Sequence, residues 1–160
     1  MKNLTIIRHG KSGYELGLSD KMRTLNSTGI QKSELVAKKY LLLLPNDFLM
    51  MSSTATRAKM TALIFAKTFN IAEKHINYID DLYTFNGNEF AKIVKLTHDN
   101  VTNLLIFGHN DAITDFVNKF GDIFIDNVPT SGLVSIDFNT DFWANIKDGK
   151  TIKTIFPSEQ

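Results

Sequence analysis

The sequence contains no cysteine among its 160 residues. This absence excludes disulfide bonds, thiol catalysis and thiolate metal sites together. Long hydrophobic runs are also missing, and the apolar stretch at residues 4–7 is far too short for the core of a secretion signal or for a membrane span. We therefore expect a cytoplasmic protein that has no membrane partner.

Neither sign of charge dominates, because the formal net charge at pH 7 is only +1. Proteins that bind nucleic acid through electrostatics carry a marked excess of basic residues. The sequence thus gives no reason to expect a nucleic-acid partner, although it allows a local basic pocket. The hydrophobic content of 43% and the chain length predict one globular domain with its own core, spanning residues 1–160. The oligomeric state is left open.

Arginine is scarce in this chain. There are fifteen lysines but only three arginines, which are Arg8, Arg23 and Arg57. Lysine suffices where a positive charge only needs to stay solvated, whereas the planar guanidinium group binds phosphate or carboxylate through two parallel hydrogen bonds. The three arginines are therefore candidates for an anion site. The alternative is that they are scattered surface charges.

Short apolar runs rich in β-branched residues alternate with helical patterns along most of the chain. The runs predict strands at residues 4–7, 48–51, 75–82, 104–107, 133–138 and 151–156. Helices are predicted to begin near residue 27, at residues 52–54, at residues 86–88 and after Asp111 as a cap. This alternation is typical of an α/β fold around a largely parallel sheet.

Two histidines stand directly after two of the predicted strands, each beside a glycine. His9 follows the run at residues 4–7, and His109 follows the run at residues 104–107. Because the carboxyl ends of parallel strands meet at one edge of a sheet, we expect His9 and His109 to face each other there. A neutral imidazole can act as a nucleophile through one nitrogen while a backbone carbonyl holds the other nitrogen.

The contexts of two arginines favour an anion site near these histidines. Arg57 falls in the first turn of the helix predicted at residues 52–54, where the helix dipole disfavours a cation unless an anion binds at the same place. Arg23 lies in a predicted loop at residues 13–26, and loops of that length are usually functional. With Arg8, they predict a cationic pocket suited to a phosphoryl group. The alternative is that Arg57 is a tolerated surface charge and Arg23 a solvated loop residue.

The motifs resemble those of the histidine phosphatase superfamily, also called phosphoglycerate-mutase-like, and within it the short SixA-type phosphohistidine phosphatases. In chain order they are RHGKS, RTLNSTG, SSTATRAKMTA, DDLY, FGHND and NVPTSGLVSIDF. The resemblance implies a three-layer α/β/α sandwich on a mixed, mostly parallel sheet of about six strands, and it implies no cofactor.

The resemblance also implies roles for particular residues. His9 would be the phosphorylated nucleophile, and Arg8, Arg57 and His109 would complete the catalytic pocket. The further substrate-binding candidates are Arg23, Gly10 and Lys11. For Lys11 the alternative is a solvated side chain.

The sequence departs from the wider superfamily in its acidic residues. Many mutases and acid phosphatases of the superfamily carry an acidic proton donor in an inserted segment near the third strand, and this short chain has little room for one. Asp81 is the nearest candidate for the donor. Absence of a strong acid suits a leaving group that departs easily, as the protonated imidazole of phosphohistidine does. Glu15 stands about where the mutases commonly carry asparagine, which disfavours mutase activity.

The sequence therefore predicts a metal-independent phosphatase that is phosphorylated on His9 and is then hydrolysed by water. The expected substrate is phosphohistidine on a protein such as a histidine phosphotransfer domain. One alternative is a small phosphoester or nucleotide in the same pocket, and another is a phosphate-binding module without turnover. A metal between the histidines is the least favoured alternative, because no carboxylate lies at reliable ligand spacing.

Overall fold

A mixed sheet forms the middle layer of the protein. The computed structural model describes residues 1–157, and within them the strand order is β3-β2-β4-β1-β5-β6. The strands are β1 (Lys2–Arg8), β2 (Leu49–Ser53), β3 (Ile76–Ile79), β4 (Asn103–Gly108), β5 (Leu133–Phe138) and β6 (Lys150–Ile155). The first four run parallel, whereas β5 pairs antiparallel with both β1 and β6.

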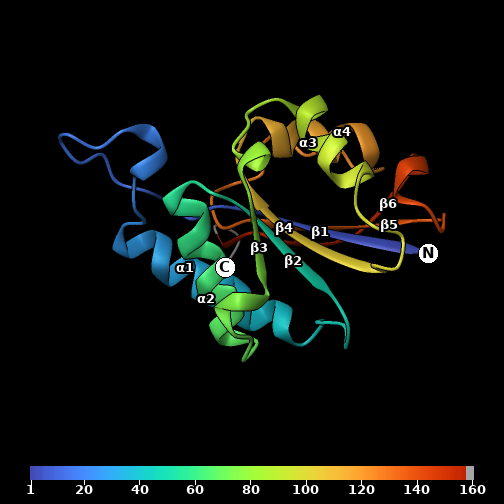
Figure 1. Cartoon of the computed structure of the whole chain (residues 1–160), viewed down its shortest axis with the longest axis horizontal. Helices are drawn as coiled ribbons and strands as arrows, with labels where there is room; N and C mark the ends of the chain where they lie inside the picture. Colours follow the sequence, from blue (N-terminus) through green and yellow to red (C-terminus); the bar gives the residue numbers. More distant parts are fainter. Residues whose placement is uncertain (158–160) are drawn as a thin grey trace.

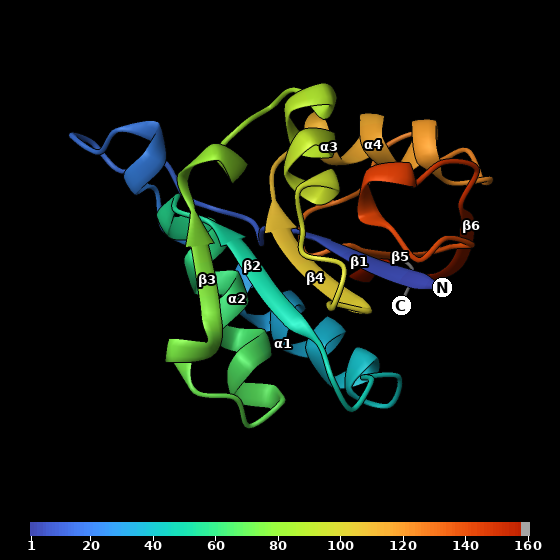
Figure 2. The same cartoon turned by 45° about the vertical axis from the view of Figure 1, so that its right-hand side comes forward.

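Helices cover both faces of this sheet, as Figures 1 and 2 show. The helices are α1 (Ser27–Leu41), α2 (Thr56–Thr68), α3 (Gly87–Lys95) and α4 (Ala112–Phe120). Phe65 of α2 belongs to the hydrophobic core on one face, and Phe90 of α3 and Phe116 of α4 belong to the core on the other. The predicted three-layer α/β/α sandwich with a mixed, mostly parallel sheet is thereby confirmed.

The middle of the central strand β1 is mostly apolar, and its place in the sheet explains why. Successive side chains of a strand point to opposite faces of the sheet, so a strand between two helical layers is buried on both sides. Leu4 and Ile6 join the core under α3 and α4, and Ile7 joins the core under α1 and α2. All three are fully buried, and each contributes about 1.5–3 kcal/mol by leaving water. The strand that carries His9 is therefore firmly held.

Two predicted boundaries were wrong. The strand predicted at residues 75–82 is only β3, because one-turn 3-10 helices at Glu73–His75 and Asp80–Leu82 flank it. The helix predicted at residues 52–54 begins at Thr56, because Ser52 and Ser53 still pair with β3 in the sheet. Arg57 nevertheless lies in the first turn of α2.

The predicted loop at residues 13–26 contains a short 3-10 helix, Asp20–Met22, and both ends of the loop are held. The backbone N–H of Asn26 donates to the carbonyl of Lys11 over 3.0 Å, and the Asn26 side chain caps α1 by accepting from the N–H of Gly29 over 2.8 Å. A Cβ at Gly29 would overlap the backbone of Lys11, so only glycine allows α1 to start this close to the segment after His9.

Candidate active site

The two histidines that follow strands β1 and β4 face each other. In the parallel pairing of these strands Arg8 lies opposite Gly108, which puts His9 and His109 at the same edge of the sheet. Their ring centroids are 5.2 Å apart, with 52° between the ring planes. Only 8% of His9 and 1% of His109 is exposed. The prediction that the two rings meet is confirmed.

Backbone contacts orient the His9 ring. Its Nδ1 lies 2.7 Å from the carbonyl oxygen of Gly10, which can only accept a hydrogen bond. Nδ1 therefore carries the proton, and Nε2 is unprotonated and carries a lone pair. The Nε of Arg57 lies 3.4 Å from this Nε2. The arrangement suits a nucleophile whose target is bound by an arginine.

The environment keeps both histidines neutral. Burial lowers the pKa of His9 to about 4, and the neighbouring Arg57 and Arg8 act in the same direction. Burial, followed by the charge of protonated His9 and Arg57, lowers the pKa of His109 to about 3. The nucleophilic form of His9 is therefore the resting form throughout the neutral range.

These lowered pKa values predict a loss of stability in mild acid. Because the unfolded chain takes up protons on these histidines near pH 6.5 and the folded chain does not, the free energy of unfolding should fall from about pH 6.5 towards pH 4. The lowering of the His9 pKa corresponds to about 3 kcal/mol in the free energy of unfolding.

Urea unfolding of the wild type and His9→Gln at pH 7 and pH 4.5 would test this pH dependence. The variant should lose less stability than the wild type, and an equal loss would contradict the prediction. His98→Gln, at an exposed site, is the control.

Arg57 is almost fully buried and divides its donors between His9 and Asp20. Its Nε faces His9, whereas Nη1 donates to the backbone carbonyl of Asp20 over 2.7 Å and Nη2 donates to Asp20 Oδ2 over 3.0 Å. Arg23 donates from Nη1 to Asp20 Oδ1 over 3.1 Å. The Tyr83 hydroxyl donates to Oδ2 over 2.5 Å. The carboxylate of Asp20 thus connects Arg23, which lies in the loop, to Arg57 in the site.

Arg8 and His109 each have a buried nitrogen without a hydrogen-bond partner among residues 1–157. These atoms are Arg8 Nε and His109 Nδ1. Arg8 Nη1 donates to the carbonyl of Val128 over 2.9 Å, and Arg8 is the last residue of β1, directly before His9. A buried polar group without a partner costs about 1–3 kcal/mol. An anion that reached these nitrogens would remove that cost.

Ser53 determines which nitrogen of His109 carries the proton. The Ser53 hydroxyl oxygen accepts from the N–H of Ala55 over 3.1 Å and lies 2.8 Å from His109 Nε2. Among the described residues, His109 Nε2 is the acceptor within reach of the Ser53 hydroxyl hydrogen, so the hydroxyl donates a hydrogen bond to Nε2. The proton of the neutral imidazole then lies on Nδ1, which makes the partnerless Nδ1 a donor.

Of the remaining predicted site residues, Gly10 is closely packed, whereas Lys11 and Asp81 are exposed. Gly10 packs so closely that a Cβ would come within 2.9 Å of the carbonyl oxygen of Gly29. Lys11 and Asp81 are exposed, and within the described residues neither side chain makes a hydrogen bond or ion pair to the site. The structure thus brings together His9, His109 and the three arginines but gives Asp81 no contact that would support a role as proton donor.

Sequence reasoning missed Asp20, Tyr83, Phe85 and Ser53. The rings of Tyr83 and Phe85 lie 5.3 Å and 5.6 Å from the His109 ring. The DDLY motif contained the signal for Tyr83. Its tyrosine follows Asp81 by two positions and contacts His109 and Asp20, whereas the Asp81 side chain does not. Asp20 had no comparable signal, since a Ser-Asp pair reads as an ordinary turn.

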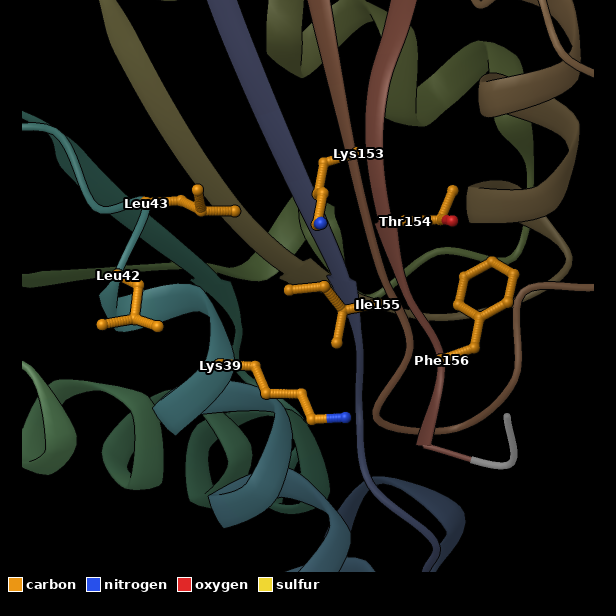
Figure 3. A pocket seen from close by; sticks show the side chains of 7 residues that line it. All are labelled: Lys39, Leu42, Leu43, Lys153, Thr154, Ile155 and Phe156. Carbon is orange, nitrogen blue, oxygen red and sulfur yellow. The ribbon is translucent and has the colours of Figure 1, made fainter. Parts of the chain in front are cut away.

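A cavity elsewhere on the molecule contains none of the predicted site residues. The cavity in Figure 3 has a volume of about 360 Å³ and lies between the end of α1 and β6. Its lining residues are Lys39, Leu42, Leu43, Lys153, Thr154, Ile155 and Phe156. None of the contacts that build the candidate active site involves these residues, so the cavity is separate from that site.

Residues 1–157 contain neither a metal-binding cluster of histidine, cysteine or acidic side chains nor a membrane-spanning helix. No group of three or more histidine, cysteine, aspartate or glutamate side chains is arranged to hold a metal ion in this part of the chain. None of its helices combines the length and the apolar character needed to cross a membrane.

Comparison with known proteins gives relatives in sequence and in structure. No protein-family model matches the chain. The uncharacterized protein Rv1276c of Mycobacterium tuberculosis H37Rv is 28% identical over 153 residues, which cover 89% of this chain and 93% of the relative. The sequence relative thus supports a common architecture over most of the chain.

Solved structures are similar over nearly the whole length. A protein from Agrobacterium tumefaciens assigned as the phosphohistidine phosphatase SixA has a TM-score of 0.80 at 23% identity and covers 96% of this chain and 97% of its own. The protein histidine phosphatase SixA in complex with tungstate has a TM-score of 0.81 at 18% identity, with 98% of each chain covered. Mycobacterial glucosyl-3-phosphoglycerate phosphatase Rv2419c has a TM-score of 0.68 at 10% identity, over 95% and 97% of the chains. The resemblance predicted from the motifs is confirmed: the chain has the fold of the histidine phosphatase superfamily, and the SixA phosphatases score highest of these three.

Proposed function

We propose that this protein is a phosphatase that works through a phosphohistidine on His9. The observation that carries the proposal is the unprotonated Nε2 of a buried, neutral His9 beside Arg57 Nε. In the first step Nε2 attacks the phosphorus atom, and the bond from phosphorus to the leaving group breaks. In the second step water attacks the phosphorus, the P–N bond to His9 breaks, and inorganic phosphate is released.

The surrounding donors support transfer of a phosphoryl group in particular. Phosphoryl transfer is catalysed mainly by positioning and by charge stabilisation of the equatorial oxygens. Arg57 Nε and the partnerless Arg8 Nε and His109 Nδ1 are donors that such oxygens would satisfy. In this proposal the arginines supply the positive charge, and neither a metal ion nor a cofactor takes part.

We propose phosphohistidine on a protein, such as a histidine phosphotransfer domain, as the substrate. Its imidazole leaves without help from a strong acid, which agrees with the exposure of Asp81 and with the lack of a hydrogen bond or ion pair from its side chain to the site within residues 1–157. The likeness in fold to SixA phosphatases also favours this substrate. The likeness to glucosyl-3-phosphoglycerate phosphatase favours a second candidate, a small phosphoester in the same pocket. A cytoplasmic location stays a prediction from the sequence.

A substrate panel tests the proposal. The protein would be incubated with a phosphorylated histidine phosphotransfer domain and with several small phosphoesters, in the presence of a chelator, and released phosphate would be measured. We expect release from the phosphorylated domain, an acid-labile phosphoenzyme, and no effect of the chelator. Faster release from a phosphoester would favour the second candidate. Tight binding of a phosphopeptide without any trapped phosphoenzyme would instead indicate a binding module.

A further inference from the structure

Asp20 stands beside the catalytic residues although nothing in the motifs assigned it a role. It lies in the 3-10 helix Asp20–Met22, and its carboxylate accepts hydrogen bonds from Arg57 Nη2, Arg23 Nη1 and the Tyr83 hydroxyl. A carboxylate offers about four lone-pair sites. Within residues 1–157, the three donors leave about one site unused, and the side chain of Asp20 is 46% exposed. The carboxylate can therefore accept one more hydrogen bond, from a group that enters from solvent.

The position of Asp20 relative to His9 agrees with contact to a leaving group. Arg57 separates the two residues, with Nε towards His9 Nε2 and Nη2 towards Asp20. In an in-line displacement, a phosphoryl group attacked by His9 carries its leaving group on the side away from Nε2. One guanidinium group thus spans the distance from the nucleophile to a carboxylate at the mouth of the site.

From this arrangement we propose that Asp20 is a specificity-determining residue that selects phosphohistidine over phosphate esters, by accepting a hydrogen bond from the protonated ring nitrogen of the substrate. The inference rests on the proposed function and adds the group that recognises the leaving imidazole. The exposed ring of Phe85, beside Tyr83 at a centroid distance of 5.6 Å, offers an aromatic surface for that imidazole.

In this arrangement, transfer of the phosphoryl group to His9 needs no general acid to protonate the leaving group. The substrate imidazole carries phosphorus on one nitrogen and a proton on the other, and the carboxylate of Asp20 holds that proton by a hydrogen bond. When His9 Nε2 forms its bond to phosphorus, the old P–N bond breaks and its electron pair returns to the substrate nitrogen. The ring leaves as neutral imidazole with the proton where it was.

A phosphate ester of an alcohol has no such proton. Its oxygen leaves as an alkoxide unless an acid protonates it, and Asp20 cannot do so near neutral pH, because the hydrogen bonds from Tyr83 and Arg57 lower its pKa to about 2. The charged and titratable groups around the carboxylate are Arg57, Arg23, Tyr83, His109 and Lys21. Asp20 is therefore fixed as an acceptor, which distinguishes the two substrate classes.

Asp20→Asn tests the inference. The probes are a synthetic peptide phosphorylated on histidine and p-nitrophenyl phosphate, whose leaving group needs no proton. Because asparagine keeps the size and loses the charge, we expect the ratio of kcat/KM for the peptide to kcat/KM for the ester to fall about tenfold or more. The alkaline limb of peptide hydrolysis should also move to lower pH, since a carboxylate raises the pKa of a nearby imidazolium. Asp111→Asn is the matched control: burial lowers the pKa of Arg8 and the charge of Asp111 opposes that lowering, so this variant also removes a carboxylate near a site arginine, and it should leave the ratio unchanged.

The outcomes separate this inference from the function on which it rests. If Asp20→Asn lowered both kcat/KM values by the same factor and left the pH profile in place, Asp20 would only hold Arg57, and the inference would be wrong while the phosphatase proposal stood. A wild type that hydrolysed neither probe and formed no phosphoenzyme would overturn both. Asp20→Ala serves in the same comparison if the asparagine variant does not fold.

Discussion

His9→Ala is expected to lower kcat/KM for a histidine-phosphorylated peptide at least about a thousandfold, as loss of a nucleophile does in other covalent catalysts. The reason is specific to this ring. The Nδ1 of His9 is held by the Gly10 carbonyl, and its unprotonated Nε2 accepts a hydrogen bond from Arg57 Nε. Alanine removes Nε2, the atom that we propose receives the phosphoryl group. Phosphate release and acid-labile labelling of the protein measure the effect, and both should disappear together.

His75→Ala is the matched control for this loss. His75 ends the exposed 3-10 helix before β3 and makes no side-chain contact with the site. The control should retain wild-type turnover and labelling. If His9→Ala released phosphate as fast as the wild type, the covalent mechanism would be wrong, whatever the fate of the substrate assignment.

The parts of the fold and site that the sequence predicted are those determined by local pattern. Leu4, Ile6 and Ile7 are apolar because the strand has a helical layer on each side, and that burial is visible in the sequence as a short, mostly apolar run. Two such runs that each end at a glycine and a histidine must bring His9 and His109 together if the strands are parallel neighbours, as β1 and β4 are. Elements and their order follow directly from such patterns.

The parts that the sequence did not predict depend on contacts between distant segments. Asp20 reaches Arg57, 37 positions later, and Tyr83, 63 positions later, through a loop with no periodic pattern. Ser53 looked like a helix cap because serine often caps helices. The sheet extends through it, and its hydroxyl contacts both the N–H of Ala55, before α2, and the ring of His109. Pairing in the sheet outweighed the local preference, and the position of the loop was determined by tertiary packing alone.

Arg57→Lys is expected to lower kcat/KM about a hundredfold to a thousandfold, even though it keeps the positive charge. The guanidinium of Arg57 presents donors in three directions: Nε towards His9, Nη1 towards the backbone carbonyl of Asp20 and Nη2 towards its carboxylate. A lysine ammonium is a single point of charge on a flexible chain, so it cannot face the phosphoryl group and Asp20 at once. Steady-state kinetics with the histidine-phosphorylated peptide would measure the loss.

Arg23→Lys makes the same chemical change at a residue that contacts Asp20 but not His9. Its guanidinium binds Asp20 Oδ1, the carbonyl of Gly13 and the hydroxyl of Ser12. Because none of these contacts reaches the nucleophile, the loss in kcat/KM should be several-fold and far smaller than that of Arg57→Lys. Equal losses in the two variants, with equal unfolding free energies, would mean that Arg57 acts through Asp20 and the loop. In that case the contact between Arg57 Nε and His9 Nε2 would have no special part in phosphoryl transfer.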